Sequence, residues 1–463
     1  MSASAATTLT FLGGTRTVTG SRFLIETPSV SMLLDCGLFQ GPGELRRRNW
    51  GEPGFAPDRL DAVVLSHAHL DHSGWLPRLV RAGYAGPVLC SPWTAEVVPI
   101  VLRDAAHLQE EDAEHAAAHG YSKHHPPQPL FTAADAEKAI GLLTPVPFGQ
   151  PYSLAGAATL TLRRAGHILG SSTVELRAAG VSLGFTGDLG RADHPLLMPP
   201  VPPPVVDTML VESTYGDRVH PPRNPALLGE PVRIALDRGG VVLIPAFAID
   251  RTPVLLMALR QLMRAGAVPQ VPVYVDSPMA LAALKVYRDA FDSGAEEIRP
   301  ELSDRSDDPF DPGDLRLART ADESMRLNHP HEPRIIISAS GMATGGRVVH
   351  HLEQLLPEPR NLILLPGFQV TGTRGRDLLD GATSLKMYGR YVPVRAQVLG
   401  VEEFSAHADA KDMVAWLRTA SSAPRTCYVV HGEPDASSAL TNRIERELGW
   451  CAVVPRPGEH VLL

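Results

Sequence analysis

Four potential metal ligands lie within six residues of one another in the sequence SHAHLDH: His67, His69, Asp71 and His72. The residues just before them, LDAVVL, form an apolar run that is typical of a buried strand. His67 and His69 are two residues apart, so the end of a strand presents both side chains on one side. Neutral imidazole and ionised carboxylate are ligands that zinc prefers. A polar turn that caps a helix would account for one of these residues but not for four, and we therefore predict a zinc site.

Four ligands so close together in the sequence cannot complete the coordination of two metal ions, so other ligands must come from distant segments. Three residues have a matching context, because each follows an apolar strand: His167 in RRAGHILG, Asp188 in LGFTGDLG and His431 in YVVHGE. Glycines beside them allow a close approach of the backbone. Taken singly, each is equally well explained as a hydrogen-bonded structural residue. Taken with the SHAHLDH cluster, they favour metal binding.

Length and composition exclude several classes of protein. A chain of 463 residues is too long for one ordinary core, so two lobes are expected. There is no apolar run of about 18 residues and no signal-like N-terminus, which predicts a cytoplasmic protein without a membrane span. The four cysteines form no CxxC pair, which argues against a disulfide framework and against a thiolate zinc site. A net charge of −8 argues against a general nucleic-acid coat, so a polyanionic substrate would have to be attracted locally.

Turn-forming residues and prolines divide the chain into three blocks. Short apolar segments between turn residues fill the chain from Leu9 to about Asp207 and predict strands, many in hairpins, with one long helix near residues 91–120. The proline-rich segment 198–207 predicts a surface connector, which we take as a domain boundary. After it, strands alternate with helices, which predicts a parallel sheet covered by helices. From about Val394 the strand character returns.

The ordered set of motifs resembles the metallo-β-lactamase superfamily, whose HxHxDH motif matches residues 67–72, with His167 and Asp188 as its later motifs. Within that superfamily the chain is similar to the β-CASP nucleases, in which a cassette is inserted late in the lactamase fold. The matching signatures are VESTYG, DSPMA, SASGMATGGR, GFQVTGTRGR, FSAHAD and VVHGE. The nearest resemblance is to bacterial relatives of the endonuclease subunit of the pre-mRNA 3′-end cleavage factor. It implies an α/β protein with an αββα sandwich at 1–208 and 394–463 and a parallel-sheet β-CASP domain at 209–393.

The resemblance also implies how two zinc ions would be held, with manganese as a substitute of similar ligand preference. One ion would take His67, His69 and His167, the other would take Asp71, His72 and His431, and Asp188 would bridge both. Such a pair of ions activates a hydroxide, and Asp71 is therefore also counted among the catalytic residues. Two divalent ions outweigh two carboxylates and one hydroxide, so this pocket is cationic and attracts a phosphate inside an acidic protein.

Three further residues receive roles by resemblance. His407 in FSAHAD would protonate or stabilise the leaving oxygen, and Glu212 in VESTYG would hold it and raise its pKa. Asp35 in MLLDCG would orient a ligand histidine from behind. On the residues alone, FSAHADAKD also fits the start of a helix and Asp35 also fits a hairpin turn. Both alternatives stay open at this point.

Phosphate contacts away from the metal ions have weaker signals. Ser338, Ser340 and Gly341 lie between an apolar strand and a helix, and Ser277 lies in a similar turn, where backbone amides and the helix dipole favour an anion. Arg374 in TGTRGR is a candidate contact to an RNA backbone. Glycine-rich turns of this kind also occur for geometric reasons alone, and exposed arginines are often simply solvated.

The predicted function is that of a metal-dependent ribonuclease that cuts RNA internally, from a 5′ end, or both. A β-CASP nuclease that acts on DNA is an alternative, although such enzymes lack a histidine at the position of His431. A small-molecule hydrolase of the same base fold would not need the cassette, and a non-catalytic scaffold of the family lacks the ligands that are present here. Whether the protein is a monomer or a homodimer is left open.

The remaining histidine pairs are assigned no role in the site: His115 and His119, His124 and His125, His350 and His351.

Overall fold

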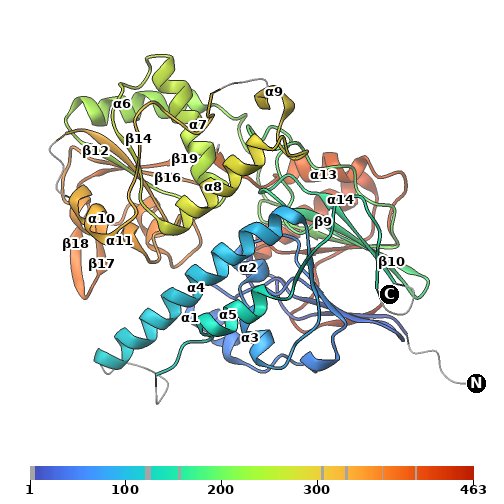
Figure 1. Ribbon diagram of the computed structural model, residues 1–463. Coiled ribbons are helices and arrows are strands. Elements are labelled where there is room, and N and C mark those ends of the chain that lie inside the picture. Colours follow the sequence, from blue (N-terminus) through green and yellow to red (C-terminus); the bar gives the residue numbers. More distant parts are fainter. Residues whose placement is uncertain are drawn as a thin grey trace, which may run out of the picture. The chain divides into compact units, whose positions relative to one another are not determined.

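The computed structural model shows a two-unit α/β protein (Figure 1). It describes residues 6–119, 127–154, 158–303, 307–328, 332–367, 369–401 and 404–463, so His124 and His125 lie outside the described residues. The first compact unit comprises Met1–Val219 and His407–Leu463, and the second comprises His220–Ala406. The sequence placed these boundaries slightly earlier, at 208/209 and 393/394. Strand pairing explains the difference, because β11 (Thr208–Glu212) pairs within the first unit and β19 (Gln397–Val401) within the second.

Two sheets of the first unit pack face to face. Within the described residues the first sheet has the order β22 (His460–Leu462), β1 (Thr8–Phe11), β2 (Phe23–Glu26), β3 (Ser31–Leu34), β4 (Ala62–Val64), β5 (Val88–Cys90) and β6 (Leu143–Pro145). The second has the order β21 (Ala452–Val453), β20 (Thr426–Val430), β11, β10 (Val181–Phe185), β9 (Ser172–Ala178), β8 (Thr159–Arg164) and β7 (Tyr152–Ser153). Their inward side chains, such as Phe11, Phe23 and Phe185, form one buried cluster. Burial of these aromatic rings stabilises the sandwich.

Helices cover the outer faces of this sandwich. On one side lie α2 (Leu70–Ser73), α3 (Leu76–Arg81), α4 (Pro92–His119) and α5 (Ala133–Ile140) (Figure 1). On the other side α13 (Ala410–Arg418) and α14 (Pro434–Leu448) pack on the second sheet. In α13 the residues Ala410, Met413, Val414 and Leu417 are buried, at the spacing of one apolar helix face. The predicted αββα layers and the long helix near 91–120 are therefore confirmed.

The second unit contains a sheet in which every assigned pairing between strands is parallel. Its order is β14 (Leu315–Leu317), β13 (Val273–Val275), β15 (Arg334–Ser338), β12 (Val241–Pro245), β16 (Leu362–Pro366) and β19. The helices are α6 (Gly229–Asp237), α7 (Arg251–Arg264), α8 (Pro278–Asp292), α10 (Ala321–Leu327), α11 (Arg347–Leu355) and α12 (Arg374–Leu379). The strands VVLIP and LILLP are buried along their whole length, as expected for a parallel sheet covered on both faces.

Small elements complete the two units. A separate antiparallel hairpin, β17 (Ser384–Met387) and β18 (Arg390–Pro393), belongs to the second unit. The short helices are α1 (Gly43–Arg47) and α9 (Pro300–Ser303), with 3₁₀ turns at Arg48–Trp50, Pro57–Arg59 and Pro225–Leu228. Among the described residues, no helix combines the length and apolar character that a membrane crossing requires.

Candidate metal centre

The predicted metal ligands meet at one edge of the two sheets of the first unit. His67 follows β4, His167 follows β8, Asp188 follows β10 and His431 follows β20. Strands β10, β11 and β20 are mutually parallel, so the residues after them share one edge of the sheet. His67, His167, Asp188 and His431 are all at least 98 % buried. The fold therefore brings residues that are far apart in the sequence into one buried site.

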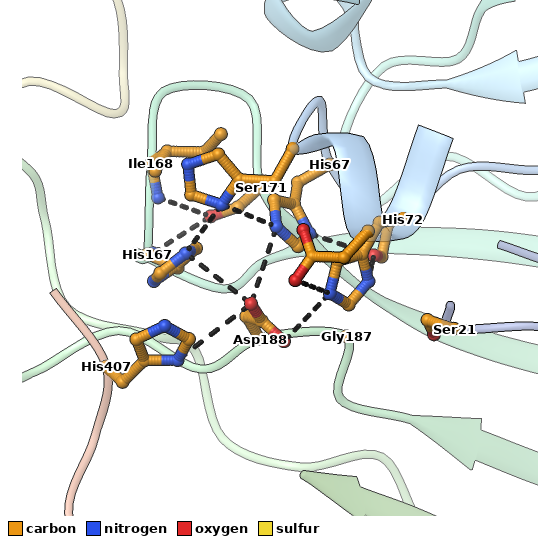
Figure 2. Close-up of polar contacts among 12 residues, drawn as sticks. Ser21, His67, His72, His167, Ile168, Ser171, Gly187, Asp188 and His407 are labelled. Carbon is orange, nitrogen blue, oxygen red and sulfur yellow. Dashed lines mark hydrogen bonds and ion pairs between the residues drawn. The ribbon is translucent and has the colours of Figure 1, made fainter. Parts of the chain in front are cut away.

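Asp188 lies at the centre of this site, with histidines on both sides (Figure 2). Its Oδ2 atom is 3.5 Å from Nε2 of His67 and 3.6 Å from Nε2 of His167. Its Oδ1 atom is 3.2 Å from Nε2 of His72 and 3.3 Å from Nδ1 of His431. The two oxygens of one carboxylate thus face two different groups of imidazoles.

The predicted ligands divide into two groups around Asp188. In the first, Nδ1 of His69 is 3.1 Å from Nε2 of His67 and 3.3 Å from Nε2 of His167. The ligand atoms of these three histidines and Asp188 all lie within 4.8 Å of one another. The second group consists of Asp71, His72 and His431, in which Oδ2 of Asp71 is 3.7 Å from Nε2 of His431. Both sets have the nitrogen and oxygen donors that suit zinc.

Several buried polar atoms of the site form no hydrogen bond within the described part of the chain, and this bears on whether the residues can hold a cation. Nε2 of His72, Nε2 of His431 and Oδ1 of Asp188 are buried and form no hydrogen bond with any residue that the structure describes. A buried polar atom that forms no hydrogen bond costs free energy, and a bound cation removes that cost. The residues present therefore fit a metal centre.

Burial and neighbouring charges shift the pKa values of several predicted ligands. Burial by itself would raise the pKa of Asp188, but the neighbouring His72 and His431 hold it well below its usual range. Burial lowers the pKa of His67 and His167 well below that of free histidine. Their imidazoles are therefore neutral near pH 7, which is the protonation state that binds metal.

Asp35 supports the second group from behind. Its Oδ2 atom lies 2.6 Å from Nδ1 of His72, and both side chains are fully buried. The same carboxylate accepts hydrogen bonds from the backbone N–H of Ser66 (2.8 Å) and from the hydroxyl of Ser21 (2.9 Å). Because Nδ1 of His72 faces Asp35, Nε2 faces Asp188 and the metal position. The carboxylate thereby fixes the orientation of the His72 imidazole, a predicted ligand.

His407 lies beside the first group. Its Nδ1 atom is 3.3 Å from Oε1 of Glu212 and 3.8 Å from Oδ2 of Asp188. Burial lowers the pKa of His407, but Glu212 and Asp188 raise it more, so that the net shift is upward. The N-cap of α13 is Asp409, whose side chain accepts from the N–H groups of Lys411 and Asp412. His407 precedes this cap and takes no part in it.

Three family models match the chain in succession. The metallo-beta-lactamase superfamily matches residues 17–228, the Beta-Casp domain matches residues 252–378, and the Zn-dependent metallo-hydrolase RNA specificity domain matches residues 391–455. Together they cover most of the chain. The protein belongs to the metallo-β-lactamase/β-CASP nuclease family.

Similar proteins agree with this assignment. The chain is 36 % identical to Ribonuclease TTHA0252 of Thermus thermophilus, over 92 % of this chain and 94 % of that protein. It is 30 % identical to Transcription termination factor FttA of Methanocaldococcus jannaschii, over 95 % of this chain and 69 % of that protein. A crystal structure of a protein of unknown function from Enterococcus faecalis matches with a TM-score of 0.54 at 16 % identity, over 99 % of this chain and 100 % of that one. The last similarity concerns the fold alone.

Several residues pack close to the predicted ligand Asp71 in contacts that the sequence did not reveal. The guanidinium of Arg22 lies 4.0 Å from the ring of Trp75 and 5.0 Å from that of Phe39, and its Nε donates to the carbonyl of Gly37 at 2.7 Å. Burial lowers the pKa of Arg22 to about 9. At Gly37 a Cβ atom would collide with the carbonyl of Asp71, so only glycine fits. These contacts join residues far apart in sequence, and no local pattern indicates them.

The five candidate phosphate contacts lie in the β-CASP domain and differ in accessibility. The hydroxyl of Ser277 caps α8 by accepting from the N–H of Ala280, and that of Ser338 donates to the carbonyl of Asp276. Both side chains are at least 95 % buried, and Gly341 is buried as well. Ser340 and Arg374 are only half-buried, so their side chains reach the surface. Arg374 donates to the carbonyls of Ala343, Thr344 and Lys386.

His351, to which the sequence assigned no role, belongs to a buried polar network of the β-CASP domain. Nε2 of His351 lies 2.6 Å from Oδ2 of Asp276, and its Nδ1 lies 2.6 Å from Oδ1 of Asn328. Arg347 donates to Oδ1 of Asp276 at 2.7 Å, and Ser324 donates to its Oδ2. The adjacent His350 is exposed. One member of this histidine pair is therefore structural, as part of a network that holds α10 and α11 to the end of β13.

Proposed function

We propose that this protein is a zinc-dependent ribonuclease that hydrolyses RNA phosphodiester bonds at the Asp188 centre. The observation that carries the proposal is the position of Asp188, whose two oxygens face two separate groups of buried ligands. The enzyme class is that of the family, a zinc-dependent metallo-hydrolase with an RNA specificity domain. The name of the Thermus thermophilus relative supports RNA as the substrate.

Seven side chains would hold two zinc ions in this centre. His67, His69 and His167 would bind one ion and Asp71, His72 and His431 the other, with Asp188 shared between them. When bound, a pair of such ions activates a water molecule for attack on phosphorus and neutralises charge on the phosphate. Manganese prefers similar ligands and would replace zinc in the same residues.

His407 would supply the proton for the leaving oxygen. Its Nδ1 faces Glu212, which leaves Nε2 as the ring atom that can reach a substrate. The carboxylate of Glu212 keeps the imidazole protonated to a higher pH than free histidine, because it raises the pKa of His407. As the P–O bond breaks, the proton on Nε2 passes to the leaving oxygen, which then departs as a neutral hydroxyl.

Two further features of the chain belong to the same proposal. His431, which the DNA-directed alternative lacks, is among the second group of ligands and supports RNA over DNA. Three of the four free cysteines are buried, and their free state fits a reducing compartment such as the cytoplasm.

The test is cleavage of three RNAs of one sequence by the purified zinc-loaded protein: labelled at the 5′ end, labelled at the 3′ end, and circularised. We expect cleavage of RNA, and a cut circle would assign internal cleavage. Release of mononucleotides from a 5′ end, with the circle intact, would assign the exonucleolytic mode instead. Asp188→Ala serves as the control for contaminating nucleases. Equal cleavage by this variant, or cleavage of matched DNA but not of RNA, would overturn the proposal.

A further inference from the structure

The β17–β18 hairpin of the β-CASP domain exposes two tyrosines. Tyr391 on β18 is 73 % exposed, and Tyr388 in the turn is 54 % exposed. Large aromatic side chains usually bury most of their surface, because their transfer from water is favourable. Two exposed rings on one short hairpin therefore call for an explanation beyond folding.

Alternation along the two strands explains why the ring of Tyr391 points outward. Leu385, Met387 and Val392 are buried in the core beneath the hairpin. Lys386 and Tyr391, which are direct cross-strand partners, are exposed on the opposite face. The inward residues are thus sufficient to attach the hairpin, and the outward pair contributes nothing to that core.

Tyr388 is held in a fixed orientation at the end of the hairpin. Its φ angle is 47° and that of Gly389 is 77°, the combination of positive φ values that a tight two-residue turn requires. Its ring stacks on that of His350 in α11, with centroids 4.8 Å apart and an angle of 20° between the planes. Its hydroxyl lies 3.0 Å from Nε2 of the same histidine. The ring is therefore ordered before any ligand arrives.

Cationic side chains lie near the rings. Lys386 is exposed on the outward face beside Tyr391, whereas Arg390 is exposed but is paired with Met387, on the other face of the hairpin. Arg374 lies between the hairpin and the loop at residues 340–346, because it donates to the carbonyls of Lys386, Ala343 and Thr344. Glu353 and Arg374 are the charged groups that act on Tyr388. Lys386 and Arg374 thus place cations at the hairpin, although the whole chain carries a net charge of −8.

We infer that this hairpin binds a single-stranded segment of RNA, with bases stacked on Tyr388 and Tyr391 and phosphates attracted by Lys386 and Arg374. Aromatic rings interleaved with cations are the usual platform for unpaired nucleotides, whose ring faces are free. Paired bases in a duplex are already stacked on their neighbours and cannot use such rings. Like charges on two copies of the hairpin would oppose self-association. The inference rests on the proposed function and names the form of RNA that the enzyme takes.

The experiment compares steady-state cleavage of an unstructured RNA and of a blunt duplex of the same sequence. The variants are the double substitution Tyr388→Ala with Tyr391→Ala, and the matched pair Tyr388→Phe with Tyr391→Phe, which keeps both rings. Met325→Ala is the control, because Met325 is a 58 % exposed apolar side chain of the same domain, on α10. Thermal unfolding of every variant checks that the fold is intact, as expected for exposed positions.

For the single strand we expect the alanine pair to raise KM about tenfold or more, with little change in kcat, because stacking acts in ground-state binding. The phenylalanine pair and Met325→Ala should stay within about twofold of the unchanged protein. An unchanged KM in the alanine pair would overturn the inference, as would an equal rise for the duplex. It would also be overturned if the unchanged protein doubled in mass with concentration and the alanine pair did not, since the partner would then be a second copy.

The same RNA, fluorescently labelled, separates failure of the inference from failure of the proposed function. If the unchanged protein binds the single strand in an anisotropy titration and the alanine pair loses that binding, but neither cuts RNA, the hairpin assignment stands and the ribonuclease proposal fails. If the unchanged protein cuts RNA and the alanine pair cuts it with the same KM, the ribonuclease proposal stands and the hairpin assignment fails.

Discussion

Asp35 and His72 form a fully buried pair in which a carboxylate oxygen lies 2.6 Å from Nδ1 of the imidazole. Neither side chain is exposed to solvent, so contacts with other residues of the protein set the geometry of the pair. The carboxylate fixes the ring so that the opposite nitrogen, Nε2, faces Asp188 at 3.2 Å. The orientation of one predicted metal ligand thus depends on a residue that does not face the metal position.

Asp35→Asn should weaken the binding of one zinc ion. An amide keeps the size of the side chain but loses the charge that holds the proton of His72 on Nδ1, so we expect a loss of affinity of roughly 10- to 100-fold. Competition with a zinc chelator measures this independently of catalysis. Ser21→Ala, which removes one hydrogen bond to Asp35 and leaves the carboxylate, is the matched control and should have a smaller effect. Unchanged zinc affinity in Asp35→Asn would contradict the role assigned to the pair.

Asp188→Ala should remove both metal ions and all cleavage, because its two oxygens face both ligand groups. His69→Ala should affect one ion only, since its ring contacts His67 and His167 and lies in the first group. Elemental analysis of the purified variants gives the zinc content per chain. A loss of one ion in Asp188→Ala, or of both in His69→Ala, would argue against a shared carboxylate.

His407→Ala should keep its zinc content but lose roughly 10²- to 10⁴-fold in kcat, the usual contribution of a positioned general acid. Glu212→Gln should lose less and should change the pH profile. A general acid works while protonated, so activity falls as the pH rises through the pKa of His407. Glu212 raises that pKa, and its removal should therefore move the fall in activity to lower pH. A profile with an unshifted basic limb would exclude the proposed pairing of His407 with Glu212.

The sequence predicts the metal ligands because each has a local sign: a place in the dense cluster SHAHLDH, or a histidine or aspartate next to a glycine at the end of a strand. The residues behind them have no such sign. Ser21 and Ser66 contact Asp35 from distant parts of the chain, and the position of Arg22 between Phe39 and Trp75 depends on tertiary packing.

The adjacent histidines His350 and His351 are a second case in which tertiary packing decides what the sequence cannot predict. Neighbouring residues on a helix point apart, which the sequence does predict. Which of the two turns inward depends on what the helix packs against, and here Asp276 at the end of β13 receives His351. His350 instead supports Tyr388 at the surface.

Asp276 provides a prediction about stability. Burial by itself would raise its pKa, but hydrogen bonds from His351, Ser324 and Arg347 hold it below the ordinary aspartate value. A carboxyl group with a lowered pKa contributes stability above the unfolded-state value of about 3.9, and this contribution is lost as the pH falls through the folded-state value. At pH 7, Asp276→Asn should therefore destabilise the protein by about 3 kcal/mol, at the lower end for a broken buried ion pair because Arg347 is partly exposed.

Urea unfolding at a series of pH values between 7 and 3 measures this contribution. The difference in unfolding free energy between the unchanged protein and Asp276→Asn should be constant near neutrality and should narrow below pH 4, because the protonated carboxyl resembles the amide. Asp289→Asn is the matched control on α8, where an exposed carboxylate pairs with Lys285 across one helical turn, and it should cost less than about 0.5 kcal/mol. If the two variants lost equal stability, or if the difference for Asp276→Asn widened in acid, the network around Asp276 would not be the source of the lowered pKa.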